Sequence, residues 1–147
     1  MGIVPGSTGY RLPTEAQWEY TAKGGQLSQG YSYSGSNDPN LVAWYSGKTG
    51  TPTAGRTHQV GLLIPNELGL FDMSGNVSEW CWDWYVGYTS GAKTDPQGAS
   101  SGDNRMVRGG SRSGSALFAR SVYRVNDAAP YRRNTMFGFR LTRPTPN

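Results

Sequence analysis

The sequence predicts an α+β domain with few short helices, short antiparallel strands and much ordered loop. The chain of 147 residues is 35% hydrophobic but holds 21 Gly, 9 Pro, five Trp and nine Tyr, so its core must be built from a few large rings connected by many turns. Stretches with a helical or strand period are short, and long aperiodic segments separate them. The length fits one compact domain, and we expect residues 1–147 to form it.

The first element is a helix expected at residues 15–23. Thr14 and Gln17 have the spacing of a capping box, in which the Thr14 hydroxyl accepts from the Gln17 amide and the Gln17 side chain reaches back. Trp18 and Ala22 lie one turn apart on one face of this helix. The glycine pair that follows should end it, because glycine readily takes a left-handed conformation.

The next segment, residues 26–57, should be an ordered loop. It is rich in Ser, Gly, Asn, Tyr and Pro and has no sustained period. Its aromatic content is too high for a solvated linker. We therefore expect Tyr31, Tyr33, Trp44 and Tyr45 to hold it against the core.

The middle of the chain should contain a short helix followed by a strand. Residues 76–80 follow a glycine turn and are predicted to form one or two helical turns, with Val77, Trp80 and Cys81 on the inner face. Residues 82–85 alternate between tryptophan and another residue type, which is the period of a strand. The single cysteine can form no internal disulfide, and we expect it to be buried.

The remaining elements are short strands joined by loop. Residues 86–104 carry turn signals and predict a loop. Residues 106–108 and 139–141 are the strongest strand candidates, and residues 119–123 are a third.

The charge of the chain is divided unevenly. Residues 105–147 hold nine of the fourteen basic side chains against one acid, whereas residues 1–104 hold five basic and nine acidic side chains. Planar guanidinium groups from the last third can pair with carboxylates from the rest of the chain. We therefore expect ion pairs between the arginines Arg108, Arg120, Arg124, Arg133 and Arg140 and the acids Glu15, Glu19, Asp72 and Glu79. A nucleic-acid-binding tail is the alternative, but a phosphate-tracking surface usually also uses Lys, which is absent after Lys93.

One segment of the last third, residues 112–135, mixes residue types without any period. It contains no Met, Trp, Lys, Glu or Gln, although these five types supply 21 of the 147 residues. An Arg-Gly-Gly-Ser run at residues 108–111 precedes it, and a Phe-Gly-Phe-Arg run at residues 137–140 follows it. A fixed frame around variable filling is typical of a rigid scaffold that presents a recognition surface.

Three ordered motifs carry a resemblance to a known family. They are residues 10–20 (YRLPTEAQWEY), residues 66–80 (NELGLFDMSGNVSEW) and the ending that runs from Arg-Gly-Gly-Ser at residues 108–111 to Gly-Phe-Arg-Leu at residues 138–141. Together they resemble the formylglycine-generating-enzyme, or sulfatase-modifying-factor, superfamily. The resemblance implies the C-type-lectin-like fold of that family. The family's earlier strands are missing ahead of Tyr10, so we expect either a minimal version of the fold or a truncated one.

The same resemblance implies that the family's oxidase chemistry is absent. The oxidases hold copper with two cysteines after the Gly-Gly-Ser motif, and the corresponding positions here are Gly114 and Ala119. Cys81 lies elsewhere in the pattern and cannot complete a pair. Iron-dependent relatives need several histidines, whereas His58 is the only one here and reads as a surface residue. We predict that the protein is not an enzyme, with a formylglycine-generating-type oxidase as the alternative.

A second resemblance fits residues 108–140. Variable proteins of diversity-generating retroelements use this lectin-like fold and end in a similar frame of Gly-Gly-Ser, spaced Arg and Pro residues, and Gly-Phe-Arg. Adenine-directed mutagenesis of their Asn-type codons cannot yield the five residue types that are missing from residues 112–135. The resemblance implies that the displayed, ligand-binding positions are Arg112, Ser113, Gly114, Ser115, Leu117, Phe118, Tyr123, Val125, Asn126, Asp127, Ala128, Tyr131, Arg132, Asn134 and Thr135.

Four aromatic or aliphatic members of this set would be the binding anchors, as in an antibody loop. They are Leu117, Phe118, Tyr123 and Tyr131. The alternative is that Leu117 and Phe118 belong to the core and that the rest is ordinary loop. The scaffold beneath them is expected to be held by Trp18, Trp80, Trp82, Trp84, Phe137 and Phe139.

Residues 72–79 resemble the calcium loop of the family. Its ligands would be the side chains of Asp72 and Glu79 and the carbonyls of Gly75 and Val77, which are the hard oxygen donors that Ca²⁺ prefers. The alternative is that the two acids bind arginines or cap a helix. Such a Ca²⁺ would be structural, and we expect no required cofactor.

These observations favour a receptor- or adhesin-like binding protein without enzymatic activity. Its partner would be a protein or a cell-surface ligand, and nucleic acid is not expected. No run of eighteen apolar residues exists, so no membrane-spanning segment is predicted. We expect a location on a virion or cell surface, where an oligomer would add avidity.

Overall fold

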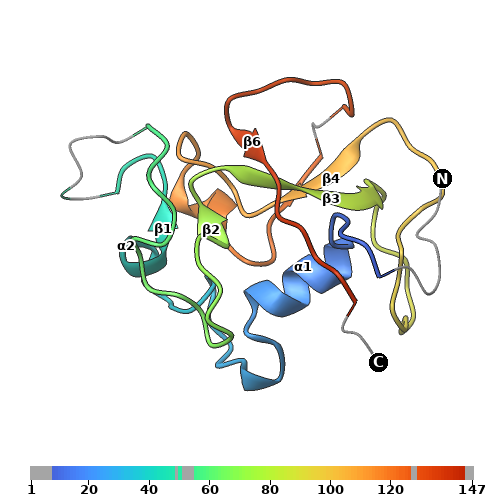
Figure 1. The fold of residues 1–147 in the computed structure, drawn as a ribbon, viewed down its shortest axis with the longest axis horizontal. Helices are drawn as coiled ribbons and strands as arrows, with labels where there is room; N and C mark the ends of the chain where they lie inside the picture. Colours follow the sequence, from blue (N-terminus) through green and yellow to red (C-terminus); the bar gives the residue numbers. More distant parts are fainter. Residues whose placement is uncertain (1–7, 49, 51–54, 127–128, 145–147) are drawn as a thin grey trace.

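The computed structural model of the protein describes residues 8–48, 50, 55–126 and 129–144. Figure 1 shows short helices and strands separated by long irregular segments. The elements are α1 (Glu15–Ala22), η1 (Gly25–Leu27), α2 (Pro39–Val42), β1 (Ala43–Trp44), β2 (Ser74–Gly75), β3 (Ser78–Trp84), β4 (Arg105–Arg108), η2 (Ala116–Ala119), β5 (Arg124–Val125) and β6 (Phe137–Gly138). The predicted α+β class is confirmed.

The largest sheet has four strands in the order β5-β4-β3-β6. Strand β4 pairs antiparallel with both β3 and β5, whereas β6 runs parallel to β3. A separate two-stranded sheet pairs β1 and β2 in parallel. The sheets are therefore mixed, which differs from the antiparallel arrangement that we expected. Helix α1 packs on one side of the larger sheet, against β3 and β4 (Figure 1).

Helix α1 begins and ends for the predicted reasons. Thr14 accepts from the Gln17 amide, and the Gln17 side chain accepts from the Thr14 amide, so the capping box is complete. The next residue after the C-cap, Gly24, has a φ of 88°, in the left-handed region that glycine tolerates. Trp18 and Ala22 are buried in a core that also contains Met73, Cys81 and Met106.

The helix predicted at residues 76–80 is wrong, because β3 occupies most of this segment. Asn76 has a φ of 62°, which stops a right-handed helix at its first residue. The Asn76 side chain stabilises this turn by exchanging two hydrogen bonds with the His58 backbone. Within β3, Cys81 and Asp83 face the core, while Trp80 is half-buried on the other face.

The strand at residues 106–108 is confirmed as β4, but two other strand predictions were misplaced. Residues 119–123 hold the end of η2 and a turn, since Arg120 and Tyr123 donate their amides to carbonyls three residues back rather than to a ladder. The last pairing with β3 uses Phe137–Gly138, and the chain then leaves the sheet. Phe139 is 67% exposed and does not belong to the scaffold core.

The segment at residues 26–57 was predicted to be loop, but its described part also contains the helix α2 and the strand β1. Tyr33 is buried in a second apolar cluster with Val42, Ala43 and Ala119, and Tyr45 packs against it. Trp44 is half-buried, whereas Tyr31 is exposed and does not hold the loop on the core.

Candidate functional site

A network of ion pairs joins helix α1 to strand β4. The Arg108 side chain is fully buried, and its Nη2 lies 2.5 Å from Glu19 Oε2 while its Nη1 lies 3.1 Å from Glu15 Oε1. Its Nη2 also donates to the Ser121 carbonyl at 2.7 Å. The helix and the turn after η2 are thereby joined through one guanidinium group.

Two further arginines extend this network, as predicted. Arg124 binds both carboxylate oxygens of Glu15, through Nε at 2.6 Å and Nη2 at 2.7 Å. Arg140 binds both oxygens of Glu79 in the same bidentate way. Glu79 also accepts from the Trp18 indole at 2.7 Å. These contacts of Glu79 therefore connect the three family motifs, since Trp18 lies in the first, Glu79 in the second and Arg140 in the third.

These contacts bear on the calcium prediction. Both Glu79 oxygens are used by Arg140, so Glu79 follows the alternative in which it binds an arginine. Asp72 accepts from the Gly61 amide through Oδ2, and its buried Oδ1 has no hydrogen-bond partner within the described residues. The Asn76 carbonyl, between the proposed carbonyl ligands Gly75 and Val77, accepts from the Arg112 amide. The acid at position 79 therefore does not fit a Ca²⁺ ligand without leaving its arginine, and calcium binding here stays a prediction.

The positions predicted to be displayed lie outside the core wherever the structure describes them. Leu117 is 49% exposed, Phe118 is 38% exposed and Tyr131 is 87% exposed. Ser113, Ser115, Asn126, Arg132 and Thr135 are exposed as well, while Arg112, Gly114, Tyr123, Val125 and Asn134 are half-buried. Asp127 and Ala128 lie outside the described residues. Between these positions, Ala119 and Ser121 are buried.

The described part of residues 112–135 is held by contacts that leave its exposed side chains outside the core. Gly110 has a φ of 69°, and a Cβ there would lie 2.5 Å from the Phe118 carbonyl oxygen, so η2 can pack this closely only on glycine. The Phe118 and Tyr123 rings lie with their centroids 4.8 Å apart. Arg112 donates to the Thr135 carbonyl at 2.8 Å and so joins the two ends of the segment.

Some predicted display positions also have a structural task. Val125 lies in β5 and pairs with Val107. The Asn134 side chain accepts from the Met136 amide at 2.9 Å. The Gly114 carbonyl accepts from the Ser46 amide at 2.8 Å. Replacing the side chains at positions 125 and 134 should therefore be more restricted than at Tyr131.

One edge of this surface comes from a segment that sequence reasoning did not assign to it. Trp44 and His58 stack with ring centroids 3.7 Å apart and planes 7° apart, and Lys48 Nζ lies 4.9 Å from the Trp44 centroid. This group neighbours Gly114 through the Ser46 amide. His58 is thus packed on an indole rather than lying loose on the surface as expected, and no sequence pattern indicated the contact.

Two arginines expected to form structural ion pairs do not. Arg120 and Arg133 are exposed, and neither has a carboxylate within ion-pair distance in the described parts of the chain. Asp72, expected as an arginine partner, binds a backbone amide instead. The surface around residues 112–135 therefore carries cationic groups that the frame does not use.

Cys81 is buried in the core, as predicted. Burial raises the pKa of its thiol well above the ordinary value, which outweighs the opposite effect of the nearby Arg108 guanidinium. Such a thiol is a poor nucleophile and metal ligand at neutral pH. Within the ranges that the structure describes, no three His, Cys, Asp or Glu side chains converge as a metal site would require.

The described residues line a groove and a smaller pocket that are open to solvent. A groove of about 1,090 Å³ lies between α1 and the loop at residues 86–99, but its acids Glu15 and Glu19 are already paired with arginines. A smaller pocket of about 320 Å³ lies on the outer face of β3 and includes Pro130, next to Tyr131. Among the described residues, no helix is long and apolar enough to cross a membrane.

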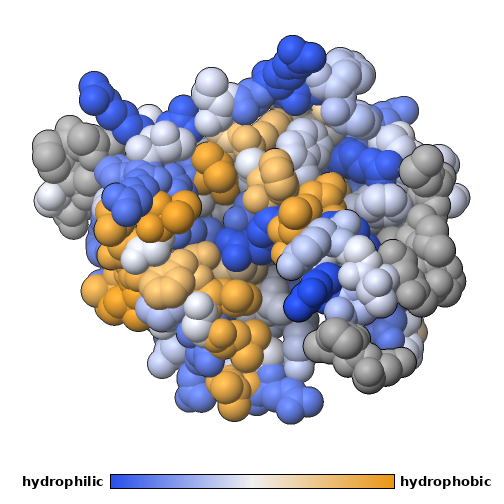
Figure 2. Space-filling model, viewed as in Figure 1, coloured by the Kyte–Doolittle hydropathy of each residue, from blue (hydrophilic) through white to orange (hydrophobic). Residues whose placement is uncertain are grey.

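Apolar side chains also gather on one outer face. Figure 2 shows them at the lower left, over the loop that connects β1 to β2. Val60 is 72% exposed, and Leu62, Ile64 and Phe71 are exposed in the same loop. Exposed apolar areas often mark contacts with other molecules.

Comparison with known proteins identifies the family. The family model of the Sulfatase-modifying factor enzyme 1-like domain matches residues 2–145. The chain belongs to this family. The solved structure of Treponema denticola variable protein 1 superposes with a TM-score of 0.85 at 41% identity, over 97% of this chain and 50% of that one. The predicted family and its C-type-lectin-like fold are thereby confirmed.

Two curated relatives show how varied the family is. Chaperone protein LppX of Paenibacillus barcinonensis is 52% identical over 96 residues, which are 56% of this chain and 34% of that protein. The formylglycine-generating enzyme of Streptomyces coelicolor is 37% identical over 113 residues, which are 70% of this chain and 36% of the enzyme. The chain spans about a third of the length of these relatives.

Proposed function

We propose that this member of the sulfatase-modifying factor family is a binding protein without enzymatic activity, which presents residues 112–135 to a protein or cell-surface ligand. The single observation that carries the proposal is that this segment separates exposed from buried side chains according to their predicted role. The described positions assigned to display are exposed or half-buried, whereas Ala119 and Ser121 between them are buried. A rigid backbone with replaceable outer side chains can change its partner without refolding.

Similarity to Treponema denticola variable protein 1 over almost the whole chain supports the same reading. By analogy with retroelement variable proteins, the displayed side chains would be hypervariable. We place the protein on a virion or cell surface as part of this proposal.

The residues at the oxidase positions support the absence of catalysis. Gly114 and Ala119 stand where the family's oxidases would carry the cysteine pair; Gly114 precedes η2, and Ala119 is its last residue and is 1% exposed. The only thiol of the chain, Cys81, is in the core. A copper-thiolate site of the family's type therefore has no ligands at these positions.

Two matched libraries test the proposal. The first randomises ten display positions that are exposed or half-buried, and the second randomises ten core and frame positions such as Trp18, Met73 and Met106. Both are displayed on yeast and sorted first for protease resistance and then for binding to one defined protein, hen lysozyme. We expect most of the first library and almost none of the second to stay folded, and lysozyme binders to arise from the first. Equal loss of folding in the two libraries would refute the proposal.

A second assay separates binding from the oxidase alternative. The purified protein is incubated with Cu(I), oxygen and a cysteine-containing peptide substrate, beside an active formylglycine-generating enzyme as a positive control. We expect no aldehyde product. Turnover by this chain would overturn the non-enzymatic part of the proposal, whatever the libraries show.

A further inference from the structure

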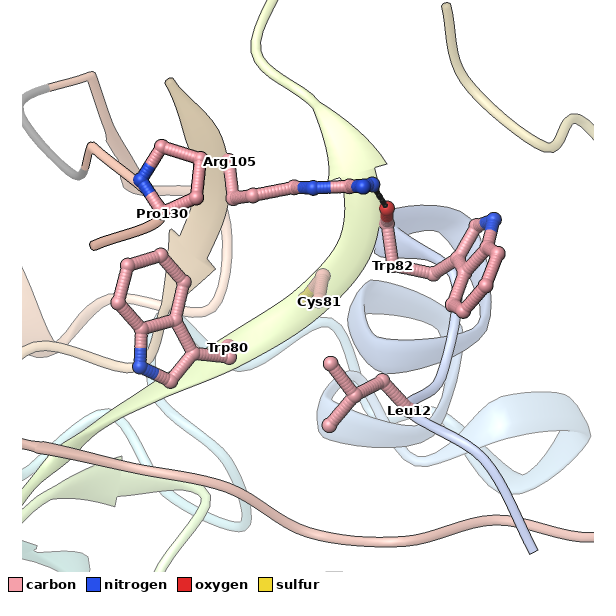
Figure 3. A pocket seen from close by; sticks show the side chains of 6 residues that line it. All are labelled: Leu12, Trp80, Cys81, Trp82, Arg105 and Pro130. Carbon is pink, nitrogen blue, oxygen red and sulfur yellow. Dashed lines mark hydrogen bonds between the residues drawn. The ribbon is translucent and has the colours of Figure 1, made fainter. Parts of the chain in front are cut away.

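The small pocket on the outer face of β3 is built from residues of four separate parts of the chain. Figure 3 shows Trp80 and Trp82 on β3, with Leu12 below them and with Arg105 and Pro130 above. Indole, leucine and proline side chains make its walls mainly apolar. Its volume of about 320 Å³ is at the lower end of the range for small-molecule sites.

Arg105 is the polar group of this pocket. Its guanidinium carbon lies 3.8 Å from the Trp84 ring centroid and 5.7 Å from that of Trp82, and its Nη1 donates to the Trp82 carbonyl (Figure 3). No carboxylate lies within ion-pair distance of it among the residues that the structure describes. Burial lowers the pKa of Arg105, although the Asp83 carboxylate, which lies beyond ion-pair distance, acts in the opposite direction, and a guanidinium stays charged at neutral pH.

This cation differs from every paired arginine of the frame. Arg108, Arg124 and Arg140 each meet a carboxylate of the same chain. Arg105 is held in place by two indoles and one carbonyl, which fix its plane without neutralising its charge. Besides the Nη1 that donates to Trp82, this guanidinium has N–H groups without a hydrogen-bond partner among the described residues, which match a planar carboxylate, and the surrounding apolar walls match a hydrocarbon group.

The pocket lies beside the proposed ligand-binding surface. Pro130 forms part of its wall, and the neighbouring Tyr131 is the most exposed aromatic side chain among the described residues. The Trp80 ring also makes an edge contact with the Phe137 ring, at a centroid distance of 5.2 Å. Its other walls come from residues outside the 112–135 segment, so its chemistry would stay constant when displayed residues change.

We propose that this pocket is a constant subsite that binds an apolar group bearing a carboxylate, such as an apolar side chain next to an acidic residue or to a chain terminus of the partner protein. The carboxylate pairs with Arg105, and the apolar group lies between Leu12, Trp80 and Pro130. This inference deepens the proposed binding function by adding a shared anchor to the variable contacts. It rests on that function for the identity of the partner, but the pocket can be tested without one.

The test uses 4-phenylbutyrate as the probe. Binding to the whole chain is followed by ¹H–¹⁵N NMR of the tryptophan indole N–H signals. Butyrate and 4-phenylbutyramide are the controls, since the first lacks the apolar group and the second lacks the charge. We expect saturable shifts of the Trp80 and Trp82 signals with 4-phenylbutyrate and at least tenfold weaker binding of both controls.

Two variants locate the interaction. Arg105→Gln should weaken 4-phenylbutyrate binding at least tenfold, whereas Arg133→Gln, which removes an exposed arginine without a carboxylate partner among the described residues, should leave it unchanged. If Arg105→Gln does not fold, Leu12→Phe fills the apolar wall instead and should also abolish binding. Equal binding of the acid and the amide, shifts spread over signals far from the pocket, or no shift at all would overturn the inference.

The outcomes separate this inference from the proposed function. Lysozyme binders from the display library together with no 4-phenylbutyrate binding would remove the constant subsite alone. Binding of the probe together with collapse of both libraries would leave a carboxylate pocket on a chain that does not display variable residues.

Discussion

In and next to the four-stranded sheet, Arg108, Arg124 and Arg140 direct their guanidinium groups at carboxylates, whereas within residues 112–135 Arg120 and Arg133 are exposed and meet no carboxylate in the described parts of the chain. The same residue type therefore serves the frame in one region and the surface in the other. Burial separates the two groups of arginines. An unpaired guanidinium raises the free energy of the folded state when it is buried, but has almost no effect when it is in water.

The comparison extends to the apolar residues. Trp18, Met73 and Met106 are almost completely buried beneath the sheet, while Leu117 and Tyr131 extend into solvent from a segment of the same chain. Stability should depend on the first region and partner choice on the second. The following predictions test that division, from the largest expected effect to the smallest.

The largest effect is expected for Arg108→Met. This change removes a fully buried guanidinium and leaves Glu15, Glu19 and the Ser121 carbonyl without one of their donors. Breaking a buried ion pair by deleting one partner costs about 3–5 kcal/mol. Urea denaturation should show a loss of this size, and Arg120→Met is the matched control on the surface. Similar losses for both variants would contradict the division between frame and surface.

A smaller effect is expected for Gly110→Ala. The left-handed backbone of Gly110 disfavours any side chain, and the new Cβ would approach the Phe118 carbonyl oxygen to 2.5 Å. Strain of this kind costs about 1–3 kcal/mol. The free energy of unfolding should fall accordingly, and Gly91→Ala, whose φ of 96° is also positive but whose Cβ would meet nothing within 4 Å, separates backbone strain from the steric contact. A smaller loss at Gly110 than at Gly91 would show that η2 does not depend on this close approach.

Asp83 provides a pH-dependent test of the frame. Burial raises the pKa of this carboxyl group above its usual value, although the hydrogen bond from the Glu15 amide acts in the opposite direction. An acid with a raised pKa in the folded state stabilises the fold below its ordinary pKa and loses that contribution as pH rises through the folded value. The unfolding free energy of Asp83→Asn should therefore improve relative to the parent chain between about pH 3.5 and pH 7. Denaturation at several pH values measures this, and a constant difference would contradict it.

The smallest effect on stability is expected for Tyr131→Ser. The side chain is 87% exposed, and surface substitutions usually change the free energy of unfolding by no more than about 0.5 kcal/mol. Binding to a partner selected on the parent surface should nevertheless weaken at least tenfold, as is typical of a central aromatic contact. Calorimetry and denaturation on the same variant provide both values. A large loss of stability would place Tyr131 in the frame.

The local parts of the fold were predictable from the sequence. The capping box at Thr14 and the glycines after Lys23 determine α1 through contacts within a few residues. Strand β4 was predictable from its β-branched and apolar residues. The imbalance of charge indicated that arginines of the last third would meet acids of the first two thirds, although it could not say which arginines would stay outside.

The errors occurred where distant segments decide the backbone. Residues 76–80 have a local pattern compatible with a helix. However, hydrogen bonds between Asn76 and His58 stabilise a left-handed turn, and pairing with β4 makes the rest of the segment a strand. The stack of His58 on Trp44 and the pocket around Arg105 join residues far apart in sequence. No periodicity records such contacts.

By itself the sequence determined the family motifs, the first helix and the absence of a cysteine pair, because all of these depend on residue identity and short spacing. Only the tertiary structure decided which arginines are neutralised and which remain available. An ion pair requires two charged groups to meet at about 3 Å, and the packing of α1 on the sheet brings Glu15 and Glu19 to Arg108 while leaving Arg105 between indoles.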